Sequence, residues 1–166
     1  MTLLVRCRLR SSHWKIFVSE SFDCDVNFKE YSADPLLFYT GDIRLNENKM
    51  RGELPSELFR LPNLFRLHLS DNAFNGTLPD DMSAVSNLRD LRLQNTEIEG
   101  TLPAGLFNLV NLFEIFLSGA NFTGTLPDAF SRLANATDIW LHDNLFTGAI
   151  PGDAFAALTR LSKFYC

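Results

Sequence analysis

Apolar residues recur along most of the chain with a period of 24 residues, starting each time at Ile43, Leu67, Leu91, Ile115 or Ile139. Each copy reads L-x-L-x-x-N-x-φ-x-G-x-L-P-x-x-L-x-x-L-x-N-L, where φ is an apolar residue. A strict period of this length is typical of a solenoid, in which copies of one structural unit stack on each other. One copy cannot bury its own leucines, but stacked copies place them in a continuous apolar column.

The positions within one copy predict its local structure. In L-x-L both leucines face one side of a short strand, so each copy contributes one rung of a parallel sheet. The glycine suits a turn with an unusual backbone angle, and the proline fixes an extended path after that turn. These two residues are the same in all copies: Gly52, Gly76, Gly100, Gly124 and Gly148, then Pro55, Pro79, Pro103, Pro127 and Pro151.

The copies resemble the plant-type leucine-rich repeats, whose pattern LxxLxLxxNxLxGxIPxxLxxLxxL matches residues 43–163 nearly throughout. Segments such as LFRLHLSDNAFNGTLP and IWLHDNLFTGAIP are similar to repeats of plant receptor-kinase ectodomains, of polygalacturonase-inhibiting proteins, and of repeat families in algae and diatoms. The resemblance implies an α/β-type repeat solenoid. It would be a right-handed, curved superhelix with a parallel β-sheet on its concave face and irregular or 3-10 segments on its convex face.

The chain departs from the family pattern in two ways. The asparagine that bonds the backbone of the adjoining coil is replaced in the third and fourth copies by Thr96 and Ala120, so we expect a weaker ladder there. The fifth copy carries one additional residue near Gly152. The asparagine is retained at Asn48, Asn72 and Asn144.

Length and pattern together predict one domain with three parts. Residues 1–42 are an N-terminal capping region, residues 43–163 are five leucine-rich repeats of 24–25 residues, and residues 164–166 begin a truncated sixth repeat or a C-terminal cap. A solenoid needs a polar unit over its last rung, so we expect the natural protein to continue beyond Cys166.

Net charge and the lack of long apolar runs disfavour nucleic acid and the membrane as partners of this segment. The net charge of −5 disfavours a nucleic-acid partner, which would need a basic face. No apolar run approaches the roughly 18 residues of a membrane-spanning helix, so we expect no membrane contact by this segment. Residues 1–19 lack the apolar core of a signal peptide. They could be an organelle transit segment, part of the cap, or an internal part of a longer protein.

A possible disulfide and three glycosylation motifs would suit a protein that passes through the secretory pathway. The family resemblance implies a Cys7–Cys24 disulfide in the N-terminal cap, and the alternative is two buried free thiols. Three N-x-T motifs predict glycosylation and an extracellular or cell-surface location, with chance matches as the alternative. These motifs begin at Asn75, Asn121 and Asn135.

The residues that flank the strand leucines face away from the core, on the concave face of the solenoid, so we expect the binding site there. Phe116 and Trp140 are expected to be exposed side by side and to be continued by Tyr165. Exposed adjacent aromatic residues are typical of a contact site. The alternative is that they fold down onto the sheet or contact a further C-terminal segment.

Beside the aromatic residues, three acidic residues follow one another in a row: Asp90, Glu114 and Asp138. Neighbouring like charges destabilise a sheet unless a cation lies close by. Arg66 and Arg92 could supply part of that charge diagonally, and a basic group on the partner could supply the rest. A solvated acidic face is the other interpretation.

Catalysis has little support in the sequence. His68 and His142 have aspartates nearby, but no serine or cysteine nucleophile with an oxyanion site accompanies them. We expect no cofactor and no metal site.

The sequence therefore predicts a non-catalytic module that binds a protein or peptide, as part of a receptor ectodomain. A soluble inhibitor of an extracellular enzyme and a structural spacer are the alternatives. The candidate partner-binding residues are Phe116, Trp140, Tyr165, Asp90, Glu114, Asp138, Arg92 and His142.

Overall fold

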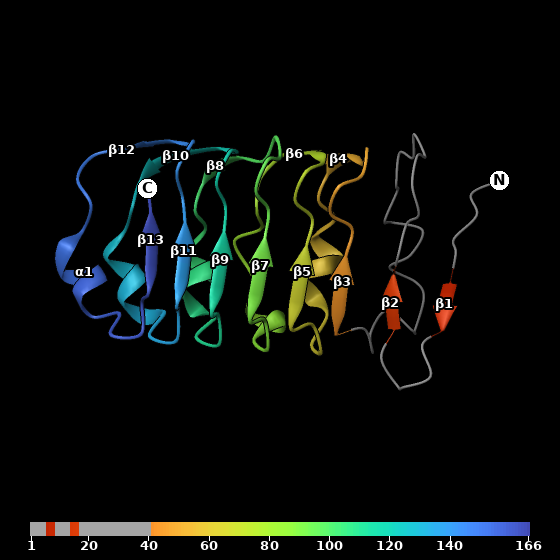
Figure 1. Ribbon diagram of the computed structural model, residues 1–166, viewed down its shortest axis with the longest axis horizontal. Coiled ribbons are helices and arrows are strands. Elements are labelled where there is room, and N and C mark those ends of the chain that lie inside the picture. The colour runs from red at the N-terminus through yellow and green to blue at the C-terminus, as the bar shows by residue number, and fades with distance from the viewer. Residues whose placement is uncertain (1–5, 9–13, 17–40) are drawn as a thin grey trace.

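The computed structural model describes residues 6–8, 14–16 and 41–166 of the 166-residue chain. Short strands and helical segments alternate along the sequence, and successive coils stack side by side along the long axis of the molecule (Figure 1). The chain is an α/β repeat solenoid, as the sequence predicts.

An eight-stranded sheet runs the length of the described structure in the order β1-β2-β3-β5-β7-β9-β11-β13. The strands from β2 to β13 are parallel, and β1 pairs with β2 in the antiparallel sense. Asp138 pairs with Lys163, which confirms the additional residue in the fifth copy. The strands are β1 (Arg6–Arg8), β2 (Trp14–Ile16), β3 (Asp42–Arg44), β5 (Arg66–His68), β7 (Asp90–Arg92), β9 (Glu114–Phe116), β11 (Asp138–Trp140) and β13 (Lys163–Tyr165).

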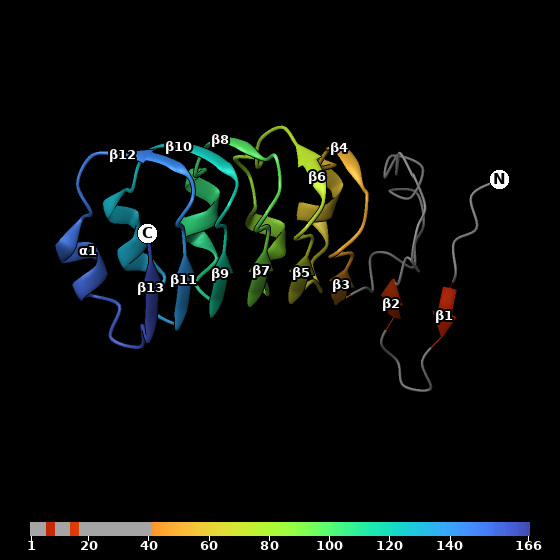
Figure 2. The ribbon, with the colours of Figure 1, turned by 45° about the horizontal axis from the view of Figure 1, so that its top comes forward.

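Five further strands lie along another edge of the coils, where Figure 2 shows them in front at the top. They form a three-stranded sheet in the order β12-β10-β8 and a separate β4-β6 pair, which we call the second sheets. The sequence pattern did not predict them. They are β4 (Arg51–Glu53), β6 (Ala73–Asn75), β8 (Glu99–Thr101), β10 (Asn121–Thr125) and β12 (Leu145–Thr147).

The repeated glycines lie in or directly beside these second strands. Gly124 has a φ of +82°, in the left-handed region that other residues rarely adopt. A Cβ atom at this position would lie 2.9 Å from Cγ2 of Thr101 on the preceding coil. Both the backbone angle and the close approach therefore require glycine, as predicted.

Helical segments follow the prolines and lie behind the eight-stranded sheet in the view of Figure 1. Four of them are 3-10 helices: Ser56–Arg60, Ser83–Val85, Ala104–Asn108 and Asp128–Arg132. The fifth is an α-helix, α1 (Gly152–Ala156), in which the N–H of Phe155 bonds the carbonyl of Pro151 four residues earlier. The additional residue of the fifth copy thus gives that coil room for a wider helical turn.

The core is one continuous apolar column between the eight-stranded sheet and the helical segments. The middle residues of successive strands, such as Leu67 and Leu91, are completely buried, and so is Leu93. Phenylalanines extend the column on the helical side, where the rings of Phe107 and Phe130 meet edge to face at 5.0 Å. Each coil therefore depends on its two neighbours for burial, as expected of a solenoid.

Two asparagine ladders join the coils through their backbones. Nδ2 of Asn72 donates to the carbonyl of Leu45 at 2.8 Å, and the N–H of Met50 donates to its Oδ1 at 3.0 Å. Thr96 instead bonds Leu93 within its own coil, which confirms the predicted weak rung. A second ladder, which the sequence analysis missed, joins Asn87, Asn111 and Asn135 to the carbonyls of Pro62, Ser86 and Val110.

Several N-terminal predictions cannot be compared with the structure. The predicted Cys7–Cys24 disulfide and most of the predicted capping region lie outside the described residues. The boundaries at residues 42 and 163 stay predictions. No helix among the described residues is long and apolar enough to cross a lipid bilayer.

Candidate functional site

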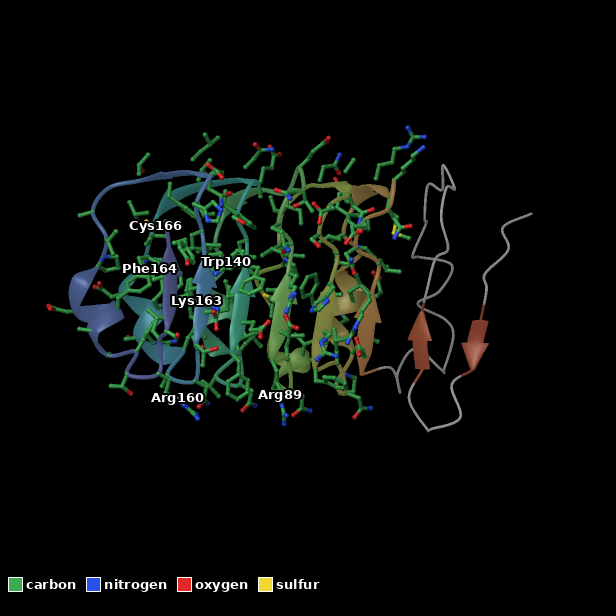
Figure 3. The ribbon with its side chains drawn as sticks, viewed as in Figure 1. Arg89, Trp140, Arg160, Lys163, Phe164 and Cys166 are labelled. Atoms are coloured by element: carbon green, nitrogen blue, oxygen red, sulfur yellow. The ribbon has the colours of Figure 1, made fainter. Side chains whose placement is uncertain are left out.

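The outward-facing side chains of the eight-stranded sheet form one surface, which we call the open face; Trp140 and Lys163 lie on it in Figure 3. The middle residue of a strand points into the core and its neighbours point outward, as with buried Ile139 between Asp138 and Trp140. The pairing register from β3 to β13 confirms the predicted columns of equivalent residues. Neighbours in a column are about 4.8 Å apart, which is close enough for direct side-chain contact.

A continuous network of ion pairs covers the open face of β3, β5, β7 and β9. Asp90 is its centre: Oδ2 lies 2.6 Å from Nε2 of His68 and 3.2 Å from Nε of Arg66. Its other oxygen, Oδ1, lies 2.9 Å from Nε of Arg92. We call this network the charged half, and its members are Asp42, Arg44, Arg66, His68, Asp90, Arg92 and Glu114.

The network continues outward from Asp90 in both directions. Asp42 pairs with Nη1 of Arg66 at 2.8 Å and with Nε of Arg44 at 3.1 Å. Arg92 pairs with Glu114 on the next strand. Three arginines face three carboxylates, so the charges of these six side chains balance.

The surroundings of Asp90 keep it ionised. Burial alone would raise its pKa, but hydrogen bonds and charges from His68 and Arg92 outweigh burial and hold the pKa of Asp90 below its usual range. For Arg92, burial would lower the pKa, and the bonds to Asp90 and Glu114 raise it above its ordinary value. Asp90 and Arg92 therefore stay ionised and paired at neutral pH.

The three acidic residues of the predicted row each have a cation within the chain. Asp90 and Glu114 share Arg92, and Asp138 lies 3.0 Å from Nζ of Lys163. Burial would raise the pKa of Asp138, but hydrogen bonds from Lys163 and Thr137 lower it below its usual range. The acidic row does not need a basic group on a partner for its stability.

Beyond Arg92 the open face becomes aromatic over β9, β11 and β13. The rings of Phe116 and Trp140 are stacked, with centroids 4.5 Å apart and planes inclined by 26°. The next ring, Tyr165, is nearly perpendicular to Trp140 with their centroids 5.5 Å apart, and the centroids of Tyr165 and His142 are 6.1 Å apart. We call these four residues, Phe116, Trp140, His142 and Tyr165, the aromatic half.

The exposure of the aromatic residues differs from the prediction at one position. Phe116 is only 9% exposed, because Trp140 covers one face of its ring and the guanidinium of Arg92 lies 4.8 Å from the ring centroid. Trp140 is partly exposed, and Tyr165 is 48% exposed. The accessible part of the aromatic half is therefore Trp140, Tyr165 and His142, with Phe116 as the support beneath them.

Three buried side-chain atoms in the described part of the chain have no hydrogen-bond partner: Oε1 of Gln94, Nε1 of Trp140 and Nδ1 of His142. Two belong to the aromatic half, and Gln94 follows β7 at its border. An unpaired buried polar atom costs about 1–3 kcal/mol of stability. The sequence pattern gave no signal for Gln94, because a glutamine in an outward column is unremarkable until its neighbours are known.

The histidines lie in different surroundings. His68 is fixed by Asp90 within the charged half, whereas Nε2 of His142 is 3.7 Å from the exposed carboxylate of Asp143. Among the described residues, no group of three or more histidines, cysteines, aspartates or glutamates could hold a metal ion. Cys166 is free and exposed.

The three glycosylation motifs fall into two environments. Asn75 and Asn121 are exposed in β6 and β10, on the second sheets and away from the open face. Asn135 is half-buried, since its Nδ2 donates to the carbonyl of Val110 at 2.9 Å and its Oδ1 accepts from Arg160 at 2.7 Å. The structure thus separates two accessible amides from one that belongs to the second asparagine ladder.

Comparison with known families agrees with this geometry. The family model described as Leucine Rich Repeat matches residues 63–84, 87–109 and 111–133. These three segments of the chain are leucine-rich repeats. The three matched segments include β7 and β9, so they carry Gln94 and the border between the charged and aromatic halves. No curated protein sequence matches the chain.

Solved structures show the same leucine-rich repeat architecture and point to the plant type. The TDR receptor is 32% identical with a TM-score of 0.74, and the match covers 76% of this chain and 22% of that one. The ectodomain of the Arabidopsis receptor kinase HAESA, solved with an IDA peptide hormone, is 31% identical with a TM-score of 0.67 and coverages of 69% and 19%. A plant ice-binding protein is 27% identical, with a TM-score of 0.69 and coverages of 74% and 40%.

The chain spans about a fifth of the length of the TDR and HAESA structures. The likeness therefore covers the repeat architecture and not the whole of those receptors. Because the similar structures include both receptors and an ice-binding protein, the fold alone does not decide the function.

Proposed function

We propose that this leucine-rich repeat chain is a non-catalytic recognition module that binds a protein or peptide on its open face, centred on the aromatic half. The observation that carries the proposal is the adjacent, partly exposed pair Trp140 and Tyr165 on a face that is otherwise polar. Aromatic residues are enriched among the side chains that dominate binding energy at interfaces. Asp138, Glu114 and Arg92 would form the charged rim around them.

The comparisons support a receptor setting. HAESA, which shares the architecture, binds a peptide hormone in the solved structure, so a peptide is a fitting class of partner for this chain as well. The exposed Asn75 and Asn121 motifs suit an extracellular or cell-surface location. Both accessible motifs lie on the second sheets, so glycans there would leave the open face free for the partner.

Two alternatives use the same fold. As a soluble binder, the chain would inhibit an extracellular enzyme with the same open face. As a structural spacer, it would have no specific ligand. Sequencing of the native transcript beyond the Cys166 codon separates the first alternative from the receptor: about 20 apolar residues followed by a kinase signature favour the receptor ectodomain. A polar, cysteine-bearing cap followed by a stop codon favours the soluble binder.

Selection of a random dodecapeptide library displayed on phage tests the recognition role. Peptides enriched on the wild-type chain are synthesised, and their affinities are measured for a Trp140→Ala/Tyr165→Ala variant. We expect a loss of more than about tenfold, because two contact aromatics are removed. The matched control is Val110→Ala/Leu145→Ala, which removes apolar residues that are 50% and 60% exposed away from the aromatic half.

The control variant should melt within about 3 °C of the wild type, because both of its substituted residues are exposed. The aromatic variant also loses the stacking of Trp140 on Phe116, so circular dichroism must show that it is folded before its affinity is compared. Equal peptide affinity for the aromatic and control variants would exclude the aromatic half as the site. Failure to enrich any peptide would favour the spacer.

A further inference from the structure

The three unpaired polar atoms of the open face form a set across neighbouring strands. Gln94 and His142 occupy the same position after β7 and β11, with Ser118 between them after β9. Trp140 lies in β11, two residues before His142. Unpaired buried polar atoms are rare in proteins and are often found at functional sites. In the charged half, by contrast, every ionised side chain has an opposite charge as its partner.

The chemistry of the set restricts the ligand. Oε1 of Gln94 only accepts a hydrogen bond, Nε1 of Trp140 only donates one, and Nδ1 of His142 does either, depending on its tautomer. A carboxylate or phosphate has no donor for Gln94, and an ammonium group has no acceptor for Trp140. A peptide group satisfies both, because it carries one N–H donor and one C=O acceptor.

Spacing and ring geometry also favour a peptide. The columns of β7 and β11 are two strand intervals apart, or about 9–10 Å, which about three residues of an extended chain span at 3.3 Å per residue. A sugar would need an open ring face for stacking. The stacked ring of Phe116 already covers one face of Trp140, and the nearly perpendicular ring of Tyr165, with its centroid 5.5 Å away, leaves less of the indole open to a sugar.

We propose that Gln94, Trp140 and His142 bind the main chain of an extended peptide segment that crosses β7, β9 and β11. This inference rests on the proposed recognition function and adds to it how the ligand is held. The three atoms are covered in the free chain, so access requires side-chain rotation, and Gln94, His142 and Tyr165 are each at least partly exposed. Exposed side chains change rotamer within nanoseconds.

The first test separates stability from binding. Gln94→Met and Trp140→Phe each remove one unpaired polar atom and keep a large apolar side chain. We expect each variant to melt about 2–4 °C higher than the wild type, because the buried polar atom is gone. We also expect each to bind the phage-selected peptides about tenfold more weakly, since one hydrogen bond to the ligand is lost. Ser70→Ala, at the same column position in the charged half, is the control and should bind as the wild type does.

The second test measures whether hydrogen bonds from the main chain of the peptide contribute to its affinity. The selected peptides are resynthesised with one N-methylated peptide bond at each position in turn, which removes one N–H donor. Methylation at one position should weaken binding to the wild type about tenfold but should have little further effect on Gln94→Met. That coupling is expected only if the methylated N–H bonds Gln94.

Each outcome decides the proposal. If Trp140→Ala/Tyr165→Ala abolishes binding while Gln94→Met, Trp140→Phe and N-methylation change nothing, the recognition function stands and the main-chain assignment is wrong. If no peptide is enriched, both fail. If the wild type binds a neutral oligosaccharide such as cellohexaose with the same dependence on Gln94, the ligand is a sugar and the peptide assignment is overturned.

Discussion

The charged and aromatic halves of the open face rest on the same repeated architecture and differ in how their polar groups are satisfied. In the charged half, Asp90 contacts two arginines and one histidine, and the arginines and carboxylates balance. In the aromatic half, Trp140 and His142 each bury a ring nitrogen without a partner, and Tyr165 is about half exposed. The charged half therefore satisfies its polar groups within the chain, whereas the aromatic half leaves two buried ring nitrogens without a partner.

This difference shows why charge alone is a poor guide to the site in a solenoid. The charged residues at the N-terminal end of the face are the more conspicuous in the sequence, but they serve to hold neighbouring strands together. Since every coil supplies the same backbone, a change of a few outward residues converts a structural surface into a candidate binding surface. The border lies at Arg92, which pairs with Glu114 and also covers the ring of Phe116.

The largest expected effect comes from the core that both halves share. Leu93 is fully buried in the column behind β7, at the border between the halves. We expect Leu93→Ala to lower the free energy of unfolding by roughly 2–5 kcal/mol, through lost burial and the cavity that remains. Chemical denaturation measures this loss. The control Val110→Ala, at a 50% exposed site, should cost below about 0.5 kcal/mol. A Leu93→Ala loss of similar size to the control would refute a shared core.

A smaller effect should follow from breaking the charged half at its centre. Asp90→Asn leaves His68, Arg66 and Arg92 without their common carboxylate, so we expect a loss of about 2–3 kcal/mol at neutral pH. Glu114→Gln is the control, because that side chain is 37% exposed and pairs only with Arg92. Its loss should be below about 1 kcal/mol. Equal losses would mean that Asp90 is not the centre of the network.

The same variant should change the response to acid. The pKa of Asp90 is lower in the folded chain than its ordinary value of 3.8, so its contribution to stability is complete above that value. The contribution is lost as the pH falls through the lower, folded pKa. We therefore expect the wild type to lose stability more steeply than Asp90→Asn below about pH 4. Parallel curves of unfolding free energy against pH would show that folding does not lower the pKa of Asp90.

Much of the fold follows from the sequence because the period determines it. The spacing of Leu67 and Leu91 predicts the parallel rungs, and the glycines predict left-handed backbone angles, which Gly124 and its equivalents adopt. The second sheets could not be predicted in this way. Their strands centre on these turns, where backbone hydrogen bonds between adjoining coils, such as Glu99 N–H to the carbonyl of Gly76, decide the structure.

The candidate site was less predictable than the fold. The columns placed Phe116, Trp140 and Tyr165 together, and their rings do meet. Their exposure depended on side-chain packing that no column shows, since Arg92 turns to cover Phe116. The unpaired oxygen of Gln94 depends in the same way on which neighbours fail to reach it.

The smallest expected effect concerns N-linked glycans on the chain. It tests whether these glycans leave the open face accessible to a peptide. The amides of Asn75 and Asn121 are exposed on the second sheets, whereas that of Asn135 is bonded to Val110 and Arg160. We expect glycosylation at Asn75 and Asn121 in a eukaryotic secretory host, seen as a mobility shift that peptide N-glycosidase removes and that Asn→Gln at each site reduces.

Asn75→Gln and Asn121→Gln should leave both peptide binding and melting temperature unchanged, because these side chains lie away from the open face. Asn135→Gln should leave the glycan shift unchanged and lower the melting temperature by a few degrees, because it removes one rung of the second asparagine ladder. If a glycan at Asn75 or Asn121 blocks peptide binding, then the partner also contacts the second sheets. The division of one open face into a structural half and a binding half would then be too simple, since the binding surface would extend around the edge of the solenoid.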